Sequence, residues 1–297
     1  MQLNHNFAYK LYIMKSFIIT LLLTACLSPA FSQSDSINVV RADWKKKKIT
    51  SGVTLKTHRF NNNLFGSNQN VSILEIKPKK NLMLDLGYDA KKLITTSDFG
   101  KKTNSLAALN GTFFDIANGG SVDFIKSDGV VINENRLGKN GERSGHQTSA
   151  LVFNQGKLSI AKFNGDASWE KSLTGEDIMV TGPLLILDQL DEKLDSNAFN
   201  KTRNPRTAVA VTKNNRILLI TVDGRNTNAA GMSIFELTKF MRWLKSDDAI
   251  NLDGGGTTTL WISGYDGNGV VNYPTDNKKW DHEGERKVAN VVLLKKK

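Results

Sequence analysis

Short apolar segments separated by polar residues run through most of the chain. Many of them alternate apolar and polar residues, or form short apolar runs between turn-forming residues, as β-strands do. Nine such segments predict strands: 71–76, 81–86, 149–153, 158–163, 178–180, 184–187, 207–212, 217–222 and 288–294. Asn154-Gln-Gly156 predicts a tight turn between the third and fourth, and Pro78-Lys-Lys80 a turn between the first two.

A helix is predicted by apolar residues at intervals of three and four. Those residues are Ile234, Leu237, Met241 and Leu244. Ser233 stands at the expected N-cap with Glu236 three residues later, which completes a capping box for a helix over 233–245. A weaker helical pattern covers 91–102. Many strands and few helices predict an α+β fold, with a mixed and largely antiparallel β-sheet in a single domain at 38–294.

The segment 217–252 predicts a β-α-β unit, because a strand, the helix just described and a second strand at 249–252 follow one another. If both strands belong to one sheet, they are parallel and the crossover is right-handed. Asp223 and Asp253 then both lie just beyond the carboxyl ends of parallel strands, which is where ligands bind in open α/β sheets.

A predicted hairpin brings a cation to the same place. Its two strands lie on either side of Lys213-Asn-Asn-Arg216. With Asn214-Asn215 as a two-residue turn, Arg206 lies opposite Asp223 across the strand pair. We therefore expect Arg206, Asp223 and Asp253 to gather at one edge of the sheet.

Composition narrows the class of protein. Lys and Arg number 40 against 29 Asp and Glu, which gives a formal net charge of +11, and the chain has one Cys and four His. A single Cys excludes a disulfide scaffold, a Cys-ligated zinc site and an iron–sulfur cluster. We interpret the lysine runs at 45–48 and 295–297 as solvated segments that favour anionic polymers. Without a nucleic-acid motif, we expect no nucleic-acid partner.

The N-terminal residues predict export. Met14-Lys15 is followed by an apolar run at 17–27, which suits a signal peptide better than a membrane span. Ala30-Phe31-Ser32 fits a cleavage site, so we expect a signal peptide at 1–32, with Met14 as the alternative start. The competing interpretation is a lipobox ending at Cys26, which would anchor the protein as a lipoprotein. No later segment is apolar enough to span a membrane, so the expected location is periplasmic or secreted.

Candidate chemistry gathers at three places where a strand is followed by polar or glycine residues: Asn110–Asp115, Asp223–Arg225 and Asp253–Thr259. Asp-Gly after a strand is commonly a simple turn, which is the competing interpretation for Asp223. Three consecutive glycines are harder to explain in that way, because glycines are kept where the backbone needs a positive φ or a ligand comes close.

Isolated residues of reactive types have plainer interpretations. His146 and His282 lie in polar segments and are expected at the surface. Trp261 continues a strand and is expected in the core, whereas Trp280 is either core or a platform for a sugar ring. Glu236 is expected to cap its helix rather than to react.

Four segments resemble, in this order, the signature of the phosphodiester glycosidase family: Asn110-Gly-Thr-Phe-Phe-Asp115, Asn204-Pro-Arg-Thr207, Asp223-Gly-Arg225 and Asn251-Leu-Asp-Gly-Gly-Gly256. The segments 271–276 and 284–290 are also similar to bacterial members. The resemblance runs from Leu106 to Leu294, and 38–105 carries no matching motif. It implies an exported hydrolase that removes an N-acetylglucosamine-like sugar from a sugar-1-phosphodiester in envelope or environmental glycans.

The residues are compatible with this chemistry. Breaking the C1–O bond expels a phosphate monoester, whose charge an arginine neutralises well because its planar fork meets two oxygens. Arg206 and Arg225 are the candidates, and the N–H groups of Gly254–Gly256 are candidates for a nest around the same oxygens. A carboxylate must activate water or attack C1, with Asp253 the first choice and Asp223 the second. The expected substrate-binding residues are Asn110 (on a sugar hydroxyl), Asp115, Arg206, Thr207, Arg225, Gly254, Gly255, Gly256 and Thr258.

Two other functions compete with the glycosidase. A non-catalytic glycan-binding envelope module would use the same pocket. A metal-dependent phosphodiesterase would place Asp115, Asp223 and Asp253 around a divalent ion and cleave the P–O bond. The glycosidase interpretation requires no cofactor, and no ligand spacing in the chain indicates a divalent cation such as calcium.

Overall fold

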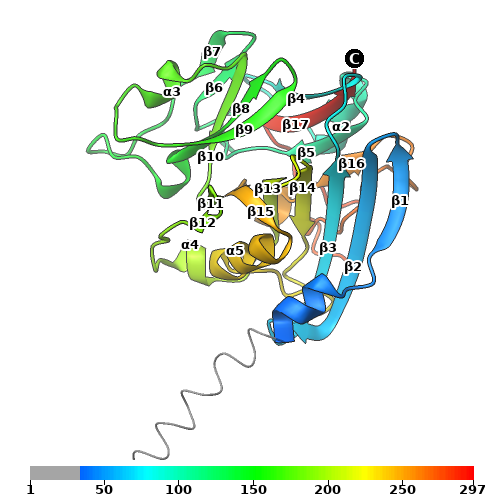
Figure 1. Ribbon diagram of the computed structural model, residues 1–297. Coiled ribbons are helices and arrows are strands. Elements are labelled where there is room, and N and C mark those ends of the chain that lie inside the picture. Colours follow the sequence, from blue (N-terminus) through cyan, green and yellow to red (C-terminus); the bar gives the residue numbers. More distant parts are fainter. Residues whose placement is uncertain (1–33) are drawn as a thin grey trace, which may run out of the picture.

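Three β-sheets form the framework of residues 34–297, the part of the chain that the computed structural model describes (Figure 1). The predicted signal peptide at 1–32, Met14 and Cys26 lie outside the described residues. The eight-stranded sheet has, in spatial order, β1 (Lys45–Thr50), β2 (Val53–Leu64), β3 (Ser67–Ile76), β14 (Ile217–Val222), β13 (Arg206–Thr212), β15 (Ser246–Asn251), β11 (Leu184–Leu187) and β12 (Leu190–Asp191).

Two smaller sheets pack beside it. The five-stranded sheet has the order β7 (Val130–Asn133), β6 (Ile125–Ser127), β10 (Asp177–Thr181), β8 (Ser149–Asn154) and β9 (Lys157–Lys162). The four-stranded sheet has the order β16 (Leu260–Ile262), β5 (Ala107–Asn110), β17 (Asn290–Lys296) and β4 (Leu82–Tyr88). The helices are a short one at 34–40, α2 (Thr96–Lys102), α3 (Trp169–Ser172), α4 (Ala198–Lys201), α5 (Ile234–Trp243) and two 3₁₀ turns, Gly145–Gln147 and Gly255–Thr257.

The central strands β13 and β14 of the eight-stranded sheet are buried on both faces, whereas its outer strands β1 and β12 are mostly exposed. One face carries Leu55, Leu74 and Leu219 into a core shared with the two smaller sheets. The opposite face packs against α5, whose Leu237 and Phe240 are fully buried. Figure 1 shows α5 lying against this sheet. It also shows the five-stranded sheet next to β4. Within residues 34–297, no helix is both long and apolar enough to cross a membrane.

The predicted capping box at the start of α5 is confirmed. Glu236 N–H donates to Ser233 Oγ over 3.1 Å, and Ser233 N–H donates to Glu236 Oε2 over 2.9 Å. The weaker helix predicted over 91–102 begins later than expected, because Thr95 is its N-cap and accepts from Asp98 N–H over 3.2 Å.

The β-α-β unit is also confirmed, with one strand between its two members. β14 and β15 each pair antiparallel with β13, so they run parallel to one another. Their carboxyl ends and the start of β13 therefore lie at the same edge of the sheet. All hydrogen-bonded strand pairs within 34–297 are antiparallel, so the fold is α+β and the predicted mixed sheet has no parallel neighbours there.

The predicted register of the β13–β14 hairpin is wrong by one residue. Arg206 pairs with Val222 rather than with Asp223. The turn has three residues instead of two, since Thr212 N–H donates to Arg216 O over 2.9 Å and Asn215 takes a left-handed φ of 53°. Because a one-residue shift reverses the face of every side chain, Arg206 and Asp223 point to opposite faces of the sheet.

The two other predicted turns have different outcomes. The strands on either side of Pro78 do not pair, because β3 lies in the eight-stranded sheet and β4 pairs with β17. The hairpin of β8 and β9 forms as predicted, with Gln155 at φ 51° and Gly156 at φ 74° in its two-residue turn.

Candidate active site

Asp253 lies at the start of the glycine loop that follows β15. Its backbone N–H donates to Gly111 O over 3.1 Å, and its Oδ1 accepts from Gly254 N–H over 2.8 Å. The residue keeps some exposed surface, but burial of its carboxyl group raises the pKa to about 6. The Gly254 N–H, the Thr257 hydroxyl and the Arg286 guanidinium oppose that rise. A carboxyl group with this pKa changes charge near neutral pH, as a catalytic acid or base must.

Asn110 holds the glycine loop in place from the end of β5. Its Nδ2 donates to Asp253 O over 2.7 Å, and its Oδ1 accepts from Thr207 Oγ1 over 2.8 Å and from Thr259 N–H over 3.0 Å. Asn110 and Thr207 are fully buried. Both were expected to bind substrate, but their polar groups bond to the protein, so they position Asp253 instead.

Two arginines approach the glycine loop. A Cβ on Gly255, which has a φ of 69°, would lie 3.2 Å from Arg225 Nη2. A Cβ on Gly256 would lie 2.8 Å from Arg286 Nη2. The missing side chains at these glycines are therefore what lets both guanidinium groups pack against the loop. Arg225 agrees with the prediction of a cation at this site, whereas Arg286 was not singled out, although it lies in the segment 284–290 that resembles the family.

Each of the two arginines is fixed by a polar partner. Arg225 donates from Nη2 to Asn204 Oδ1 over 2.9 Å and has a left-handed φ of 58°, a costly conformation that is concentrated at functional sites. Arg286 donates from Nε to Asp276 Oδ1 over 2.9 Å. Both guanidinium groups are held at the loop before any ligand binds.

The predicted nest of backbone N–H groups does not form as expected. Gly254 N–H donates to Asp253 Oδ1, and Gly255 N–H donates to Pro205 O over 2.9 Å. Two of the three N–H groups of the glycine triplet are therefore used within the protein. The cations that lie beside this loop are Arg225 and Arg286, and Arg286 is ion-paired with Asp276.

Arg206 is placed elsewhere than predicted. It is 2 % exposed, and it donates from Nε to Met232 O over 2.9 Å and from Nη2 to Phe199 O and Thr202 O over 2.9 and 2.8 Å. Burial lowers its pKa to about 10, so it remains charged. Because its side chain lies on the α5 face of the sheet, Arg206 fastens β13 to α4 and to the segment before α5.

Asp223 is the second predicted carboxylate, and it is 1 % exposed. Its Oδ2 accepts from Asn70 Nδ2 over 2.7 Å, and its Oδ1 accepts from Asn272 Nδ2 over 3.0 Å and Tyr273 N–H over 2.9 Å. Burial raises its pKa despite these bonds. With both oxygens occupied, Asp223 ties β3 to the segment at 272–273. Asp253 is the less buried of the two carboxylates.

The other predicted residues are dispersed. Asp115 accepts from Asn118 through its side-chain Nδ2 and its backbone N–H, each over 3.0 Å, from Arg136 Nη1 over 2.8 Å and from Ala117 N–H over 3.0 Å. These bonds hold the pKa of Asp115 well below its usual range. Thr258 is buried. Among residues 34–297, no three His, Cys, Asp or Glu side chains form a potential ligand set for a metal ion, so Asp115, Asp223 and Asp253 do not converge.

A buried carboxylate and a histidine lie on the other side of the 111–112 segment. Asp123 is fully buried, and it accepts from Thr112 Oγ1 over 2.6 Å and Gln147 Nε2 over 2.9 Å. His146 Nε2 lies 3.1 Å from Asp123 Oδ1. The expectation that His146 is a plain surface residue is wrong, because only 23 % of its side chain is exposed. Nothing in the sequence links these residues, which β5, β6 and a 3₁₀ turn bring together.

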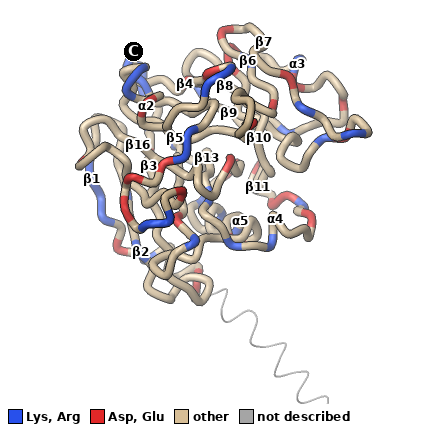
Figure 2. Tube along the Cα trace, turned by 180° about the vertical axis from the view of Figure 1, so that it is seen from behind, with Lys and Arg blue, Asp and Glu red and all other residues tan. Residues whose placement is uncertain are grey.

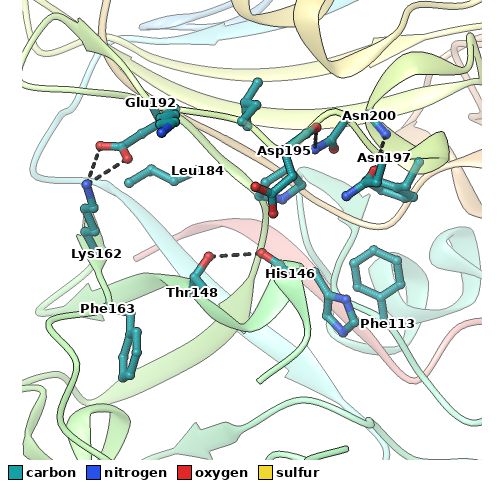
Figure 3. Close-up of a pocket in the computed structure, with 15 residues that line it drawn as sticks. Phe113, His146, Thr148, Lys162, Phe163, Leu184, Glu192, Asp195, Asn197 and Asn200 are labelled. Carbon is teal, nitrogen blue, oxygen red and sulfur yellow. Dashed lines mark hydrogen bonds and ion pairs between the residues drawn. The ribbon is translucent and has the colours of Figure 1, made fainter. Parts of the chain in front are cut away.

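His146 also lines a pocket of about 550 Å³, shown in Figure 3. The pocket lies between the five-stranded sheet and the segment from β11 to α4. Its ring walls are Phe113, Phe163 and Phe199, and His146 packs on Phe113 with ring centroids 4.1 Å apart. The Phe199 ring lies 4.8 Å from the Arg206 guanidinium, so the pocket adjoins the start of β13. A ligand-sized hollow with aromatic walls thus borders the edge that carries Asp253.

The structure places the two remaining aromatic residues in different surroundings. Trp261 is 4 % exposed and lies in the core, as predicted. Trp280 stacks on Tyr273 with ring centroids 4.1 Å apart and an interplanar angle of 3°. His282 packs on Tyr273 as well and is 2.7 Å from Asn272 O through Nδ1, so the expected surface histidine is half-buried.

These sheets and this loop define an α+β fold whose site lies at one edge of the largest sheet. The family model described as phosphodiester glycosidase matches residues 103–295, which is most of the described chain. The chain belongs to the phosphodiester glycosidase family. The match covers nearly the same residues as the resemblance seen in the sequence, and it begins beyond β1–β4.

Three relatives carry the name N-acetylglucosamine-1-phosphodiester alpha-N-acetylglucosaminidase. The mouse protein is 25 % identical over 220 residues, which cover 70 % of this chain and 41 % of its own length. The bovine and human proteins are also 25 % identical, over 222 residues each, and the matches cover 40 % and 41 % of their lengths. This chain therefore spans about two-fifths of the length of these relatives.

Two solved structures share the fold. A hypothetical protein from Synechocystis has a TM-score of 0.61 at 17 % identity, over 86 % of this chain and 64 % of its own. The zebrafish N-acetylglucosamine-1-phosphodiester alpha-N-acetylglucosaminidase catalytic domain, auto-inhibited by its pro-peptide, has a TM-score of 0.61 at 19 % identity, over 86 % of this chain and 88 % of its own.

Proposed function

We propose that this chain is an exported hydrolase that removes an N-acetylglucosamine-like sugar from a sugar-1-phosphodiester in envelope or environmental glycans. The observation that carries the proposal is the glycine loop, which begins at Asp253 and has the guanidinium groups of Arg225 and Arg286 packed against Gly255 and Gly256. Family membership and the names of the mouse, bovine and human relatives support the same substrate class.

The geometry fits cleavage of the C1–O bond. As that bond breaks, its electron pair goes to the phosphate oxygen, and the phosphate monoester that leaves gains negative charge. In this proposal, Arg225 and Arg286 neutralise that charge through charge-assisted hydrogen bonds. The phosphate monoester therefore needs a weaker general acid than an alcohol leaving group would need.

Asp253 supplies the base. With a pKa of about 6, it is mostly ionised at neutral pH and accepts a proton from the water that attacks C1. The water oxygen becomes the hydroxyl on C1, and the proton passes from Asp253 to solvent after the product leaves. Attack by the Asp253 carboxylate itself, followed by hydrolysis of the glycosyl ester, uses the same residue and differs in stereochemistry.

Sugar release from an N-acetylglucosamine-1-phosphodiester tests the proposal. The purified 33–297 chain is compared with Asp253→Asn and with Asp266→Asn, a control in which the replaced side chain is 83 % exposed. We expect free sugar from the wild type and from Asp266→Asn but not from Asp253→Asn. The anomeric proton of the first sugar released, followed by NMR, distinguishes retention from inversion.

The same reaction in ¹⁸O-labelled water distinguishes the competing functions. Label on the sugar C1 oxygen supports the glycosidase. Label on phosphate identifies a phosphodiesterase and overturns the proposed bond cleavage. Binding of the compound without turnover by the wild type identifies a glycan-binding module.

We also propose that the chain is exported through the segment at 1–32. The mass of the mature protein purified from its host tests this directly. A chain that begins at Gln33 supports cleavage after Ser32, whereas a lipid-modified chain that begins at Cys26 supports the lipoprotein alternative. A mature chain that retains Met14 or residues before it contradicts both.

A further inference from the structure

A second pocket lies at the same edge of the eight-stranded sheet, next to β2 and β3. The pocket of Figure 3 lies next to β11, toward the other end of the strand order. The second pocket has a volume of about 470 Å³. Residues of β2 and β3 form its floor. Its sides are formed by Asp43, by Lys45 at the start of β1, and by the C-terminal segments around 265–273 and 282. Its lining includes Asp43, Lys45, Thr57, His58, Arg59, Asn70, Ser72, Tyr265, Val271, Tyr273 and His282.

The charge of this pocket is mainly positive. Lys45 and Arg59 contribute fixed positive charge, and Asp43 is the one acidic residue in the lining. Arg59 donates from Nη2 to the amide oxygen of Asn228 over 2.8 Å, so a neutral group holds it. Neither Lys45 nor Arg59 forms an ion pair with any residue in 34–297. Cations without a carboxylate partner favour an anionic ligand. β1, which begins at Lys45, has four consecutive lysines, and Figure 2 shows them in blue.

The pocket also offers a rigid aromatic surface. The Tyr273 ring packs against Trp280, with centroids 4.1 Å apart, and against His282, with centroids 4.4 Å apart. Its backbone N–H is fixed by the buried Asp223 over 2.9 Å. Tyr265 lies under Lys47 Nζ, 4.5 Å from the ring centroid. Rigid aromatic rings in the lining, combined with neutral hydrogen-bonding groups such as Thr57 and Ser72, suit a sugar ring.

The pocket is connected to the candidate active site by Asn70. Asn70 lines the pocket, and its Nδ2 donates to Asp223 Oδ2 over 2.7 Å at the end of β14. In the spatial order of the sheet, β3 lies next to β14, and β14 is separated from β15 and Asp253 by β13 alone. The pocket therefore lies at the edge that carries Asp253. Lys45, His58 and Arg59 come from β1 and β2, which precede the residues matched by the family model.

We propose that this pocket binds a negatively charged sugar unit of a glycan, separately from the Asp253 site. It gives the N-terminal strands and the lysine run at 45–48 a role in retaining an anionic polymer beside the sheet edge. Binding at this pocket goes beyond the proposed hydrolysis and does not depend on it.

Isothermal titration calorimetry on the 33–297 chain tests the proposal with three probes. Tetragalacturonate carries carboxylates, glucose 6-phosphate carries phosphate, and maltotetraose is neutral. We expect at least one anionic probe to bind about tenfold or more tightly than maltotetraose, and the tighter of the two identifies the anionic group that the pocket selects.

The variant Lys45→Gln/Arg59→Gln assigns the binding to this pocket. Its matched control is Lys77→Gln/Lys80→Gln, which removes the same charge from the turn at the opposite end of β3. We expect about a tenfold loss of affinity in the first pair and an unchanged affinity in the second. Lys45→Gln alone leaves the bond between Arg59 and Asn228 intact and should show part of that loss. This single variant shows that the loss does not come from a change in the 225–230 loop.

Three results would overturn the proposal. The first is that neither anionic probe binds. The second is that maltotetraose binds as tightly as the anionic probes. The third is that the pocket variant and its control lose the same affinity. None of these results depends on turnover, so they leave the proposed hydrolysis untouched. Sugar release without anionic binding would likewise refute only the second site.

Discussion

The side-chain amide of Asn110 donates to the backbone carbonyl of Asp253 over 2.7 Å, from a residue with no exposed surface. This bond links the end of β5 in the small sheet to the loop after β15 in the large one. The two sheets are thus joined at the residue that we propose as the catalytic carboxylate.

Replacing Asn110 with Ala should damage both stability and activity. The change leaves Thr207 Oγ1, Thr259 N–H and Asp253 O without their buried partner, which costs roughly 2–4 kcal/mol in the free energy of unfolding. Urea denaturation measures the loss, and sugar release at a temperature where the variant is folded measures the displacement of Asp253. Asn214→Ala in the exposed β13–β14 turn is the control, and an equal loss there would refute the assigned role.

The activity should depend on the ionisation of Asp253. As the pH falls below about 6, the base becomes protonated, and kcat/KM is expected to fall by about tenfold for each pH unit. The profile is measured with a substrate whose phosphodiester stays ionised throughout. An activity that remains constant from about pH 7 down to about pH 4 would show that Asp253 is not the base.

The ionisation of Asp253 should also make the stability of the protein depend on pH, in a defined direction. Because the pKa of Asp253 is raised on folding, the folded state binds more protons than the unfolded state between about pH 4 and pH 6, and wild-type stability falls as the pH rises through that range. Asp253→Asn removes this penalty and should be more stable than the wild type by roughly 1–3 kcal/mol at pH 8. The difference should disappear near pH 4. Urea titrations at both pH values measure it, and a variant that is less stable at pH 8 would contradict the assignment.

Arg225 and Arg286 should act on the phosphate. Replacing either with Gln removes charge-assisted hydrogen bonds and is expected to lower kcat/KM by about 10- to 100-fold. Inhibition by the phosphate monoester product should weaken in parallel. Arg242→Gln, on the exposed end of α5 where Arg242 pairs with Asp191, should leave both measurements unchanged.

Gly255 and Gly129 provide a matched test of the glycine loop. Both have a positive φ, 69° and 77°, so an alanine at either position costs about 1–2 kcal/mol in backbone strain. A Cβ on Gly255 also meets Arg225, whereas a Cβ on Gly129 meets nothing within 4 Å. Thermal unfolding should therefore show similar losses, while only Gly255→Ala should lose sugar release. Equal sugar release by the two variants would show that Arg225 takes no part in the reaction.

Local patterns were enough to predict several parts of the fold. The capping box of Ser233 and Glu236 and the tight turn at Gln155-Gly156 are set by neighbouring residues, and both form as predicted. The parallel arrangement of β14 and β15 followed from the order of the elements and the rule on crossovers. That rule placed Asp223 and Asp253 at the same sheet edge.

Predictions that depended on register or on distant partners were less secure. One extra residue in the β13–β14 turn sent Arg206 to the α5 face and left Asp223 on the other. Pairing of β4 with β17 depends on residues about two hundred positions apart, which no local pattern contains. The contact between Asp123 and His146 has the same origin, because two separate strands and a 3₁₀ turn must pack before the side chains meet.

The sequence by itself determined the α+β class, the main helix, the family and the glycine loop that carries Asp253, because these follow from short-range patterns and motifs. Tertiary structure decided which polar residues face a ligand and which support the loop. Asn110, Thr207, Arg206 and Asp223 all read as site residues, yet burial obliges each of them to bond to the protein. A buried polar group must find its partners inside the fold, and the identity of those partners depends on packing that only the assembled sheets provide.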